Sequence, residues 1–238
     1  MPELSIIVPY YKKERTAAHD VQRKLAFLDS LHIPYELIAV IDGRVDTTYD
    51  VLSRVHHAHL HSVAYEKNRG KGYAVRKGFE AAQGNFIGYI DGDSDIAIEV
   101  IGRMYEKIKK TQADIVYPNK YHRDSQCDIS TFRRMLSTLY RVLVRMLFHI
   151  DVKDTQTGAK MYRCKVLQAV LPYLRIDGFA FEIDIFVTAA RLGYRKFFEV
   201  PVTIRRRAGS SIRYGTALRV IYDTYKLYLR SRNHQNPA

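Results

Sequence analysis

Residues 85–95 read Asn-Phe-Ile-Gly-Tyr-Ile-Asp-Gly-Asp-Ser-Asp, an apolar run followed at once by three carboxylates. The run predicts a buried strand over 86–90, because it is apolar on both faces, as parallel strands covered by helices are. An isolated Asp-x-Asp favours a solvated turn, but ligands bind open α/β sheets at the carboxyl ends of strands. Carboxylates this close repel one another, and a divalent cation that bridges them to phosphate oxygens removes that cost. The stretch therefore predicts a site for Mg²⁺ or Mn²⁺ held by Asp91, Asp93 and Asp95.

Strand and helix patterns alternate on both sides of this stretch. Short β-rich runs predict strands, and apolar residues at helical spacing predict helices. The predicted strands cover 4–9, 35–41, 61–65, 86–90, 113–117 and 197–204, and the predicted helices cover 18–31, 72–83, 98–110, 165–173, 182–192 and a segment that begins at 131. Such alternation predicts an α/β protein with a mostly parallel central sheet flanked by helices. No repeat or Pro/Gly-rich linker divides the chain, so we expect a single domain over 1–238.

Composition is typical of a soluble globular protein, with 47% hydrophobic and 26% charged residues. No apolar run approaches the roughly 18 residues that span a bilayer, and the start of the chain lacks the features of a signal peptide. We therefore expect a cytoplasmic protein. Its two cysteines, Cys127 and Cys164, are far apart in sequence and predict neither a disulfide framework nor a thiolate zinc site.

The net charge of +13 indicates a polyanionic partner, either nucleic acid or an anionic membrane surface. Residues 131–150 predict a basic amphipathic helix, since Arg134, Arg141 and Arg145 share one stripe and apolar residues share another. A core helix with a solvated face would have the same pattern. The segment 205–238 repeats the arrangement, and its tyrosines favour a membrane boundary. No DNA- or RNA-binding signature accompanies the arginines, so we expect peripheral attachment to a membrane and no nucleic acid.

Two glycines precede the helix predicted at 72–83. The segment Asn68-Arg-Gly-Lys-Gly72 would let backbone amides and Lys71 approach an anion at the positive end of that helix. It is not a P-loop, because the GxxxxGK[ST] spacing is missing, and Val75 replaces the third glycine of a dinucleotide-binding fingerprint. Taken alone, the segment predicts either a turn that starts a helix or a phosphate site.

Seven segments together resemble one family. In chain order they are Ser5-Ile-Ile-Val-Pro-Tyr-Tyr-Lys-Lys-Glu14, Val40-Ile-Asp-Gly43, Asn68-Arg-Gly-Lys-Gly72, Asp91-Gly-Asp93, Gln156-Thr-Gly-Ala-Lys160, Phe181-Glu-Ile-Asp184 and Arg205-Arg-Arg-Ala-Gly-Ser210. The order is similar to that of inverting family 2 glycosyltransferases, and the chain looks most like those that act on polyprenyl phosphates, the dolichol-phosphate mannose synthases among them. The resemblance implies a GT-A fold with a nucleotide-sugar-binding half at 1–115, an acceptor half at 116–204 and a basic C-terminal segment at 205–238.

The same resemblance implies which residues bind the donor. They are Pro9, Tyr11 and Glu14 at the nucleoside, Asp42 at the base or ribose, Asp91 and Asp93 at the metal and diphosphate, and Arg205 or Arg207 over the donor phosphates. We also expect Lys71 at the donor, from its place ahead of the predicted helix. Relatives commonly read Asp-Asp-Gly-Ser where this chain has Ile41-Asp-Gly-Arg44. The identity of the base is therefore open, and we expect GDP-mannose or a UDP-sugar.

The implied reaction is inverting transfer of a hexose to dolichyl or undecaprenyl phosphate at the cytosolic face of a membrane. The residues expected in catalysis are Asp93, Gln156, Lys160, Glu182 and Asp184, and those expected at the acceptor are Lys120, Arg133, Arg134 and Thr157. A hydroxyl acceptor would need a general base, for which Asp184 is the candidate, whereas a phosphate acceptor needs cations. Two alternatives stay open: a family 2 enzyme with a soluble or glycan hydroxyl acceptor, and a non-catalytic nucleic-acid-binding protein.

Overall fold

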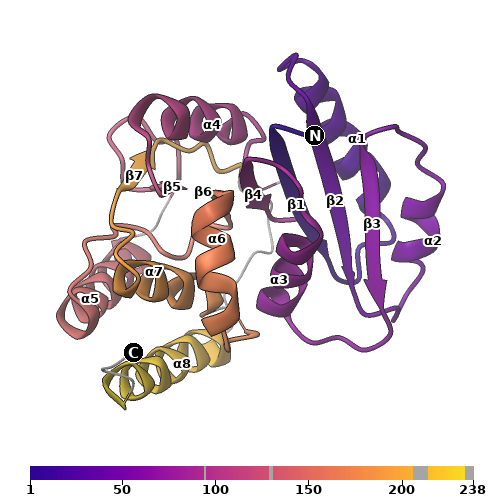
Figure 1. Ribbon diagram of the computed structural model, residues 1–238. Helices are drawn as coiled ribbons and strands as arrows, with labels where there is room; N and C mark the ends of the chain where they lie inside the picture. The colour runs from indigo at the N-terminus through magenta and orange to yellow at the C-terminus, as the bar shows by residue number, and fades with distance from the viewer. Residues whose placement is uncertain (94, 129–130, 179, 206–213, 234–238) are drawn as a thin grey trace.

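A seven-stranded sheet forms the centre of the protein (Figure 1). The computed structural model describes residues 1–93, 95–128, 131–178, 180–205 and 214–233. The strands are β1 (Leu4–Tyr10), β2 (Tyr35–Asp42), β3 (Leu60–Tyr65), β4 (Phe86–Ile90), β5 (Ile115–Pro118), β6 (Ala159–Arg163) and β7 (Phe197–Val200), in the order β3-β2-β1-β4-β6-β5-β7. Strand β6 runs antiparallel to β4 and β5, and the other neighbouring strands named here pair in parallel. The predicted α/β class and mostly parallel sheet are confirmed.

Helices connect most of these strands. They are α1 (Ala17–Asp29), α2 (Thr48–Ser53), α3 (Lys71–Ala81), α4 (Val100–Thr111), α5 (Thr131–Phe148), α6 (Cys164–Val170), the 3₁₀ turn η1 (Leu171–Tyr173), α7 (Phe181–Arg191) and α8 (Tyr214–Asn233). The predicted helices are present, with ends shifted by a few residues. Helix α2 was not predicted because six residues are too few for a helical period. Strand β6 was not predicted because it carries Lys160 in the core instead of an apolar run.

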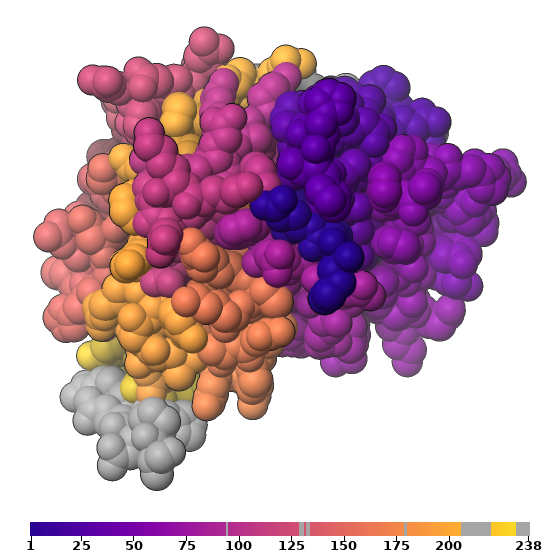
Figure 2. All heavy atoms as spheres, turned by 45° about the horizontal axis from the view of Figure 1, so that its top comes forward, coloured from indigo at the N-terminus to yellow at the C-terminus, as the bar shows by residue number. Residues whose placement is uncertain are grey.

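The two faces of the sheet have separate apolar cores. Because side chains alternate along a strand, Leu4, Ile6 and Val8 of β1 pack with α1 and α4, whereas Ile7 packs with α3, α6 and α7. Helix α7 is buried on every side and so forms part of the core. In the space-filling view, the N-terminal half (indigo to purple) and the C-terminal half (orange) lie side by side in one continuous body (Figure 2).

Helices α5 and α8 lie against each other on the lower side of the C-terminal half (Figure 1). The hydroxyls of Tyr140 and Thr224 are 2.8 Å apart, and the rings of Phe148 and Tyr228 are 6.2 Å apart. Their outward sides are apolar, and we name the following residues the exposed apolar face: Met135, Leu136, Leu139, Val142 and Met146 of α5, with Ile221, Tyr222, Tyr225 and Leu229 of α8. Much of the stripe predicted over 131–150 is therefore turned away from the core. None of the described helices combines the length and hydrophobicity needed to cross a membrane.

Two helical glycines provide a matched test of this packing. A Cβ at Gly78 of α3 would stand 2.4 Å from Ile7 Cγ2, whereas a Cβ at Gly102 of α4 would have its nearest neighbour, Phe27 Cζ, at 3.4 Å. We expect Gly78→Ala to lower the free energy of unfolding by about 1–3 kcal/mol through overpacking. Gly102→Ala should raise it by about 0.5–1 kcal/mol, because alanine is the better helix former. Urea denaturation measures both, and equal stability of the two variants would contradict the close approach of α3 to β1.

Candidate active site

The Asp91-Gly-Asp93 turn lies where the parallel neighbours β1 and β4 end. Gly92 fits there because it has no side chain: a Cβ would stand 2.6 Å from Pro9 O and 2.6 Å from Tyr10 Cδ1. The Asp91 amide donates to Gly158 O at 2.9 Å, just before β6. Three segments that are far apart in sequence therefore meet at this turn.

A line of alternating charges runs from this turn into the core. Lys71 Nζ lies 2.7 Å from Asp91 Oδ1 and 3.3 Å from Glu182 Oε1. The Lys160 ammonium donates to Glu182 Oε2 and to the carbonyl of Thr157. The four charged side chains come from α3, the end of β4, α7 and β6. The fold thus brings together four residues that the sequence assigned to donor binding and catalysis.

Burial and pairing act in opposite directions on the two lysines. Burial lowers the pKa of Lys160, although Glu182 and Asp154 favour its ammonium form. Burial also opposes the charge of Lys71, but the carboxylates of Asp91 and Glu182 outweigh it and raise the pKa of Lys71. Lys71 is therefore a cation at neutral pH, with a charge that a phosphate can use.

Two backbone amides in the first turn of α3 already have a partner. Gly72 and Tyr73 donate their amides to Asp177 O at 2.8 and 3.3 Å. Gly70, at φ +100°, makes the turn that allows this contact. The sequence suggested that backbone amides and Lys71 together approach an anion. In the structure, the Lys71 side chain is the group available for that role.

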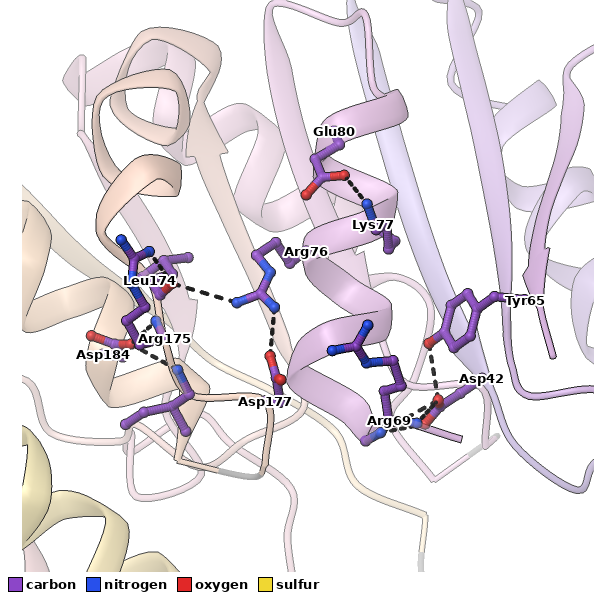
Figure 3. Close-up of polar contacts among 12 residues, drawn as sticks. Asp42, Tyr65, Arg69, Arg76, Lys77, Glu80, Leu174, Arg175, Asp177 and Asp184 are labelled. Atoms are coloured by element: carbon purple, nitrogen blue, oxygen red, sulfur yellow. Dashed lines mark hydrogen bonds and ion pairs between the residues drawn. The ribbon is translucent and has the colours of Figure 1, made fainter. Parts of the chain in front are cut away.

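Asp42 ends β2 and is almost fully buried. Its carboxylate accepts hydrogen bonds from the Tyr65 hydroxyl at 2.9 Å and the Asn68 side-chain amide at 2.8 Å. The backbone amides of Arg69 and Gly70 donate to it at 2.8 and 3.0 Å (Figure 3). Asp42 therefore fixes the turn that leads into α3, and its contact with a base or ribose stays a prediction.

The loop after β1 carries the other residues expected at the nucleoside. Glu14 Oε2 accepts a hydrogen bond from the Thr47 hydroxyl at 2.8 Å, which ties this loop to the start of α2. Pro9 is half-buried at the end of β1, and Tyr11 is 42% exposed. These side chains stand near the carboxyl ends of β1 and β2 without being packed into either core.

Asp154 is a buried residue of this region that the sequence reading missed. Its carboxylate accepts the amides of Gln156 and Thr157 at 3.0 and 3.2 Å and the Thr157 hydroxyl at 2.6 Å. Lys120 Nζ lies 3.4 Å from its Oδ1. Burial raises the pKa of Asp154, but Lys120 and Lys160 outweigh it and lower that pKa. The signal in the sequence was an Asp two residues ahead of Gln156, the spacing of an Asx-turn.

Asp184 lies apart from the charged cluster. It is fully buried and accepts the amides of Arg175 and Ile176 at 3.0 and 3.3 Å (Figure 3). Thr188 donates its hydroxyl to the same carboxylate at 3.4 Å. Burial raises the pKa of Asp184. Of the acidic pair at the start of α7, Glu182 therefore belongs to the cluster, and Asp184 supports the loop before α7.

A second buried ion pair, also missed, lies beneath the Asp91-Gly-Asp93 turn. Lys24 is paired with Asp20, and the Tyr10 hydroxyl donates to Asp20 at 2.7 Å. Burial lowers the pKa of Lys24, while Asp20 and, more weakly, Asp93 favour its charge. A Lys four residues after an Asp on a helix usually forms a solvated pair, so the sequence gave no sign of this role.

The three carboxylates expected to hold the metal are not gathered as one ligand set. Within the described ranges, no group of three or more His, Cys, Asp or Glu side chains is placed to hold a metal ion. The backbone carbonyl of Asp95 accepts a hydrogen bond at 2.7 Å from the amide of Arg205, in the segment after β7. This bond fixes the backbone of Asp95 and not its carboxylate, so Asp91, Asp93 and Asp95 stay predicted metal ligands, with Asp91 and Asp93 in the same turn. Two carboxylates fit Mg²⁺ or a similar ion, which proteins usually hold through one or two carboxylates together with substrate phosphates.

The remaining basic candidates are only partly described. Arg134 of α5 and Arg205 have exposed side chains. The Arg133 side chain and all of Arg207 lie outside the described residues. Contacts of these four arginines with donor or acceptor phosphates stay predictions.

Comparisons with known proteins show the family of this chain. The sequence profile of glycosyl transferase family 2 matches residues 5–171. A dolichyl-phosphate beta-glucosyltransferase of Dictyostelium discoideum is 26% identical over 204 residues, which cover 79% of this chain and 62% of the relative. An undecaprenyl-phosphate 4-deoxy-4-formamido-L-arabinose transferase of Shewanella sediminis is 26% identical over 171 residues, 71% of this chain and 50% of the relative. The chain thus spans only part of the length of these relatives.

A solved structure has the same fold. Glucosyl-3-phosphoglycerate synthase from Mycobacterium tuberculosis, in complex with Mn²⁺, UDP and phosphoglyceric acid, gives a TM-score of 0.69 at 18% identity. The superposition covers 95% of this chain and 78% of the synthase. The predicted GT-A fold is confirmed. Since the family profile also covers well over half of the sequence, the chain belongs to glycosyl transferase family 2.

Proposed function

We propose that the protein transfers a hexose from a nucleotide-diphosphate sugar, GDP-mannose or a UDP-sugar, to a polyprenyl phosphate. The observation that carries this proposal is the position of Lys71, whose ammonium lies between Asp91 and Glu182 at the carboxyl end of β4. There it can meet a diphosphate beside a carboxylate suited to a metal. The acceptor class is supported by two relatives that are named for dolichyl and undecaprenyl phosphate.

Breaking the bond between sugar and phosphate leaves negative charge on the departing nucleoside diphosphate. Stabilising that charge is the main electrostatic task of the enzyme. Asp91 and Asp93 would hold Mg²⁺ or Mn²⁺, which supplies a Lewis acid when bound. Lys71 and Arg205, with Arg207, would add positive charge around the same phosphates. Asp42 would act by fixing the turn that carries Lys71.

Asp93→Asn tests the donor site. We expect kcat/KM to fall by roughly 10²-fold or more, as when a single transition-state contact is removed elsewhere, and nucleoside diphosphate binding in Mn²⁺ to weaken. The fold should persist, because a half-buried loop carboxylate supports no core. The assay is nucleotide release from several sugar donors, with and without lipid phosphate, and Glu99→Gln is the control at an exposed carboxylate nearby. Full activity of Asp93→Asn, or of the parent protein in EDTA, would contradict the metal site.

A phosphate acceptor needs cations more than it needs a base. The second pKa of a phosphate monoester is about 6, so near neutrality the attacking oxygen is already largely unprotonated. Lys120, with Arg133 or Arg134, would hold this phosphate in line with the anomeric carbon. The attacking oxygen would then approach from the side opposite the departing diphosphate, and the configuration at the anomeric carbon would be inverted. Gln156 and Thr157 would line the site of the acceptor phosphate, where their backbone amides are held by hydrogen bonds to Asp154.

Asp184→Asn separates the phosphate acceptor from a hydroxyl acceptor. We expect the rate to fall, because an amide side chain accepts the backbone amides of Arg175 and Ile176 less strongly than the carboxylate does. Between pH 7 and 9 the rate of the variant should depend on pH no more steeply than that of the parent. Lys120→Met should instead raise mainly the KM for lipid phosphate. The measurement is the pH profile of kcat/KM for both variants. Strong activation of Asp184→Asn by rising pH would restore a general base and favour the hydroxyl acceptor.

The lipid-linked acceptor implies attachment to a membrane. The exposed apolar face of α5 and α8 supplies apolar surface, and Arg134 and Arg145 are exposed on α5. Apolar and basic residues on one helix suit the boundary of an anionic bilayer. We therefore place the protein peripherally at the cytosolic face of a membrane, with no nucleic-acid partner.

Changing Arg134, Arg141 and Arg145 to Gln tests this attachment. Each arginine near an anionic surface contributes on the order of 1 kcal/mol, so the triple variant should detach from anionic vesicles at physiological salt. Vesicle flotation is the measurement. The same loss of charge is made in the control at Arg15, Arg54 and Lys67, which are exposed in the N-terminal half. Equal flotation of both triple variants would show that α5 is not the attachment site.

A further inference from the structure

One carboxylate oxygen of Asp91, Oδ1, is covered by other groups of the protein, although the whole side chain is 26% exposed. Oδ1 is shielded from solvent and lies 2.7 Å from Lys71 Nζ. Oδ2 lies over Gly158, where an added Cβ would stand 1.8 Å from it. Gly158 is fixed next to β6 by its bond to the Asp91 amide. A divalent cation can therefore reach Asp91 Oδ1 only if the Lys71 side chain moves.

The charges around Asp91 already balance. Asp91 and Glu182 carry two negative charges, and Lys71 and Lys160, in contact with them, carry two positive charges. A divalent cation arriving alone would add two positive charges to a largely buried cluster, and Asp93 would offset only one of them. Uncompensated charge in such a site is costly. A nucleoside diphosphate brings the missing negative charge.

We propose that Lys71 is an internal counter-ion that competes with the divalent metal for Asp91 and moves to the diphosphate when the donor binds. The metal and the nucleoside diphosphate then bind as one unit, and the metal binds weakly without the nucleotide. This inference rests on the proposed donor site and not on the identity of the acceptor.

The contacts of Lys71 suit this movement. Lys71 is the first residue of α3, and its side chain is 15% exposed, whereas that of Lys160 is completely buried. The backbone next to Lys71 is held by the bond from Gly72 to Asp177 O, so the side chain can turn without moving the helix. After Lys71 leaves, Glu182 keeps Lys160 as its partner. No carboxylate is then left buried without a cation, since the metal replaces Lys71 at Asp91.

Mn²⁺ binding to the full chain, followed by electron paramagnetic resonance, tests the proposal. Lys71→Met removes the charge and keeps the length of the side chain. Mn²⁺ alone should bind this variant at least about tenfold more tightly than it binds the parent, within the usual range for coupled sites. GDP or UDP in the presence of Mn²⁺ should bind it at least about tenfold more weakly. Lys77→Met, on the same helix but paired with Glu80 at the surface, should change neither affinity.

Further measurements keep the result interpretable. Lys71→Arg retains the cation and should bind Mn²⁺ alone as weakly as the parent does. Asp91→Asn added to Lys71→Met should abolish the gain in Mn²⁺ affinity.

In the parent itself, GDP or UDP should tighten Mn²⁺ binding. Equal Mn²⁺ affinity with and without both nucleotides therefore overturns the inference, even if Lys71→Met fails to fold. Unchanged or weaker Mn²⁺ binding by Lys71→Met overturns it while the donor site stands. A parent that binds no Mn²⁺ with either nucleotide overturns both.

Discussion

The buried ion pair between Lys160 and Glu182 sets the positions of the elements around the active site. Lys160 comes from β6, the strand that runs against its neighbours, and Glu182 from the first turn of α7, a helix buried on all sides. A buried charge that loses its partner costs several kcal/mol, so β6 and α7 are constrained to meet at this point. The other oxygen of Glu182 reaches Lys71. One carboxylate therefore couples the interior of the fold to the cation of the proposed donor site.

Burial divides the acidic residues of the site into two kinds. Asp42, Asp154 and Asp184 are buried and accept hydrogen bonds from backbone amides, so each fixes a turn or loop. Asp91 and Asp93 lie at the mouth of the sheet and are partly exposed. The carboxylates of Asp42, Asp154 and Asp184 are therefore occupied by hydrogen bonds within the protein. Of these five residues, only Asp91 and Asp93 have partly exposed side chains for the proposed metal, and the diphosphate would supply its further ligands.

The sequence predicted the fold well because its signals are local: apolar runs mark the strands, and Asp91 and Asp93 stand directly after one of them. It also pointed to Lys71, through the glycines ahead of a predicted helix, and to Lys160 and Glu182, through resemblance to a family. It could not reveal that these side chains touch, since they come from three distant segments. The Asp20 and Lys24 pair has the spacing of a surface pair, and its burial beneath the Asp91-Gly-Asp93 turn depends on how α1 packs. The paired acids Glu182 and Asp184 look equivalent in sequence, and the direction that each faces on α7 separates them.

The segment between α6 and α7 links the exposed helices to the donor site. Arg230 of α8 donates to the carbonyl of Tyr173, and Asp184 holds the amides that follow. Asp177 then accepts the amides that begin α3 and pairs with Arg76 at 2.5 Å (Figure 3). If α8 rests on a membrane, as proposed, the same short segment bears on both the membrane contact and the backbone that carries Lys71. A change in the position of α8 at a bilayer would then reach the backbone that carries Lys71 through one short segment, because Tyr173 and Asp177 are only four residues apart.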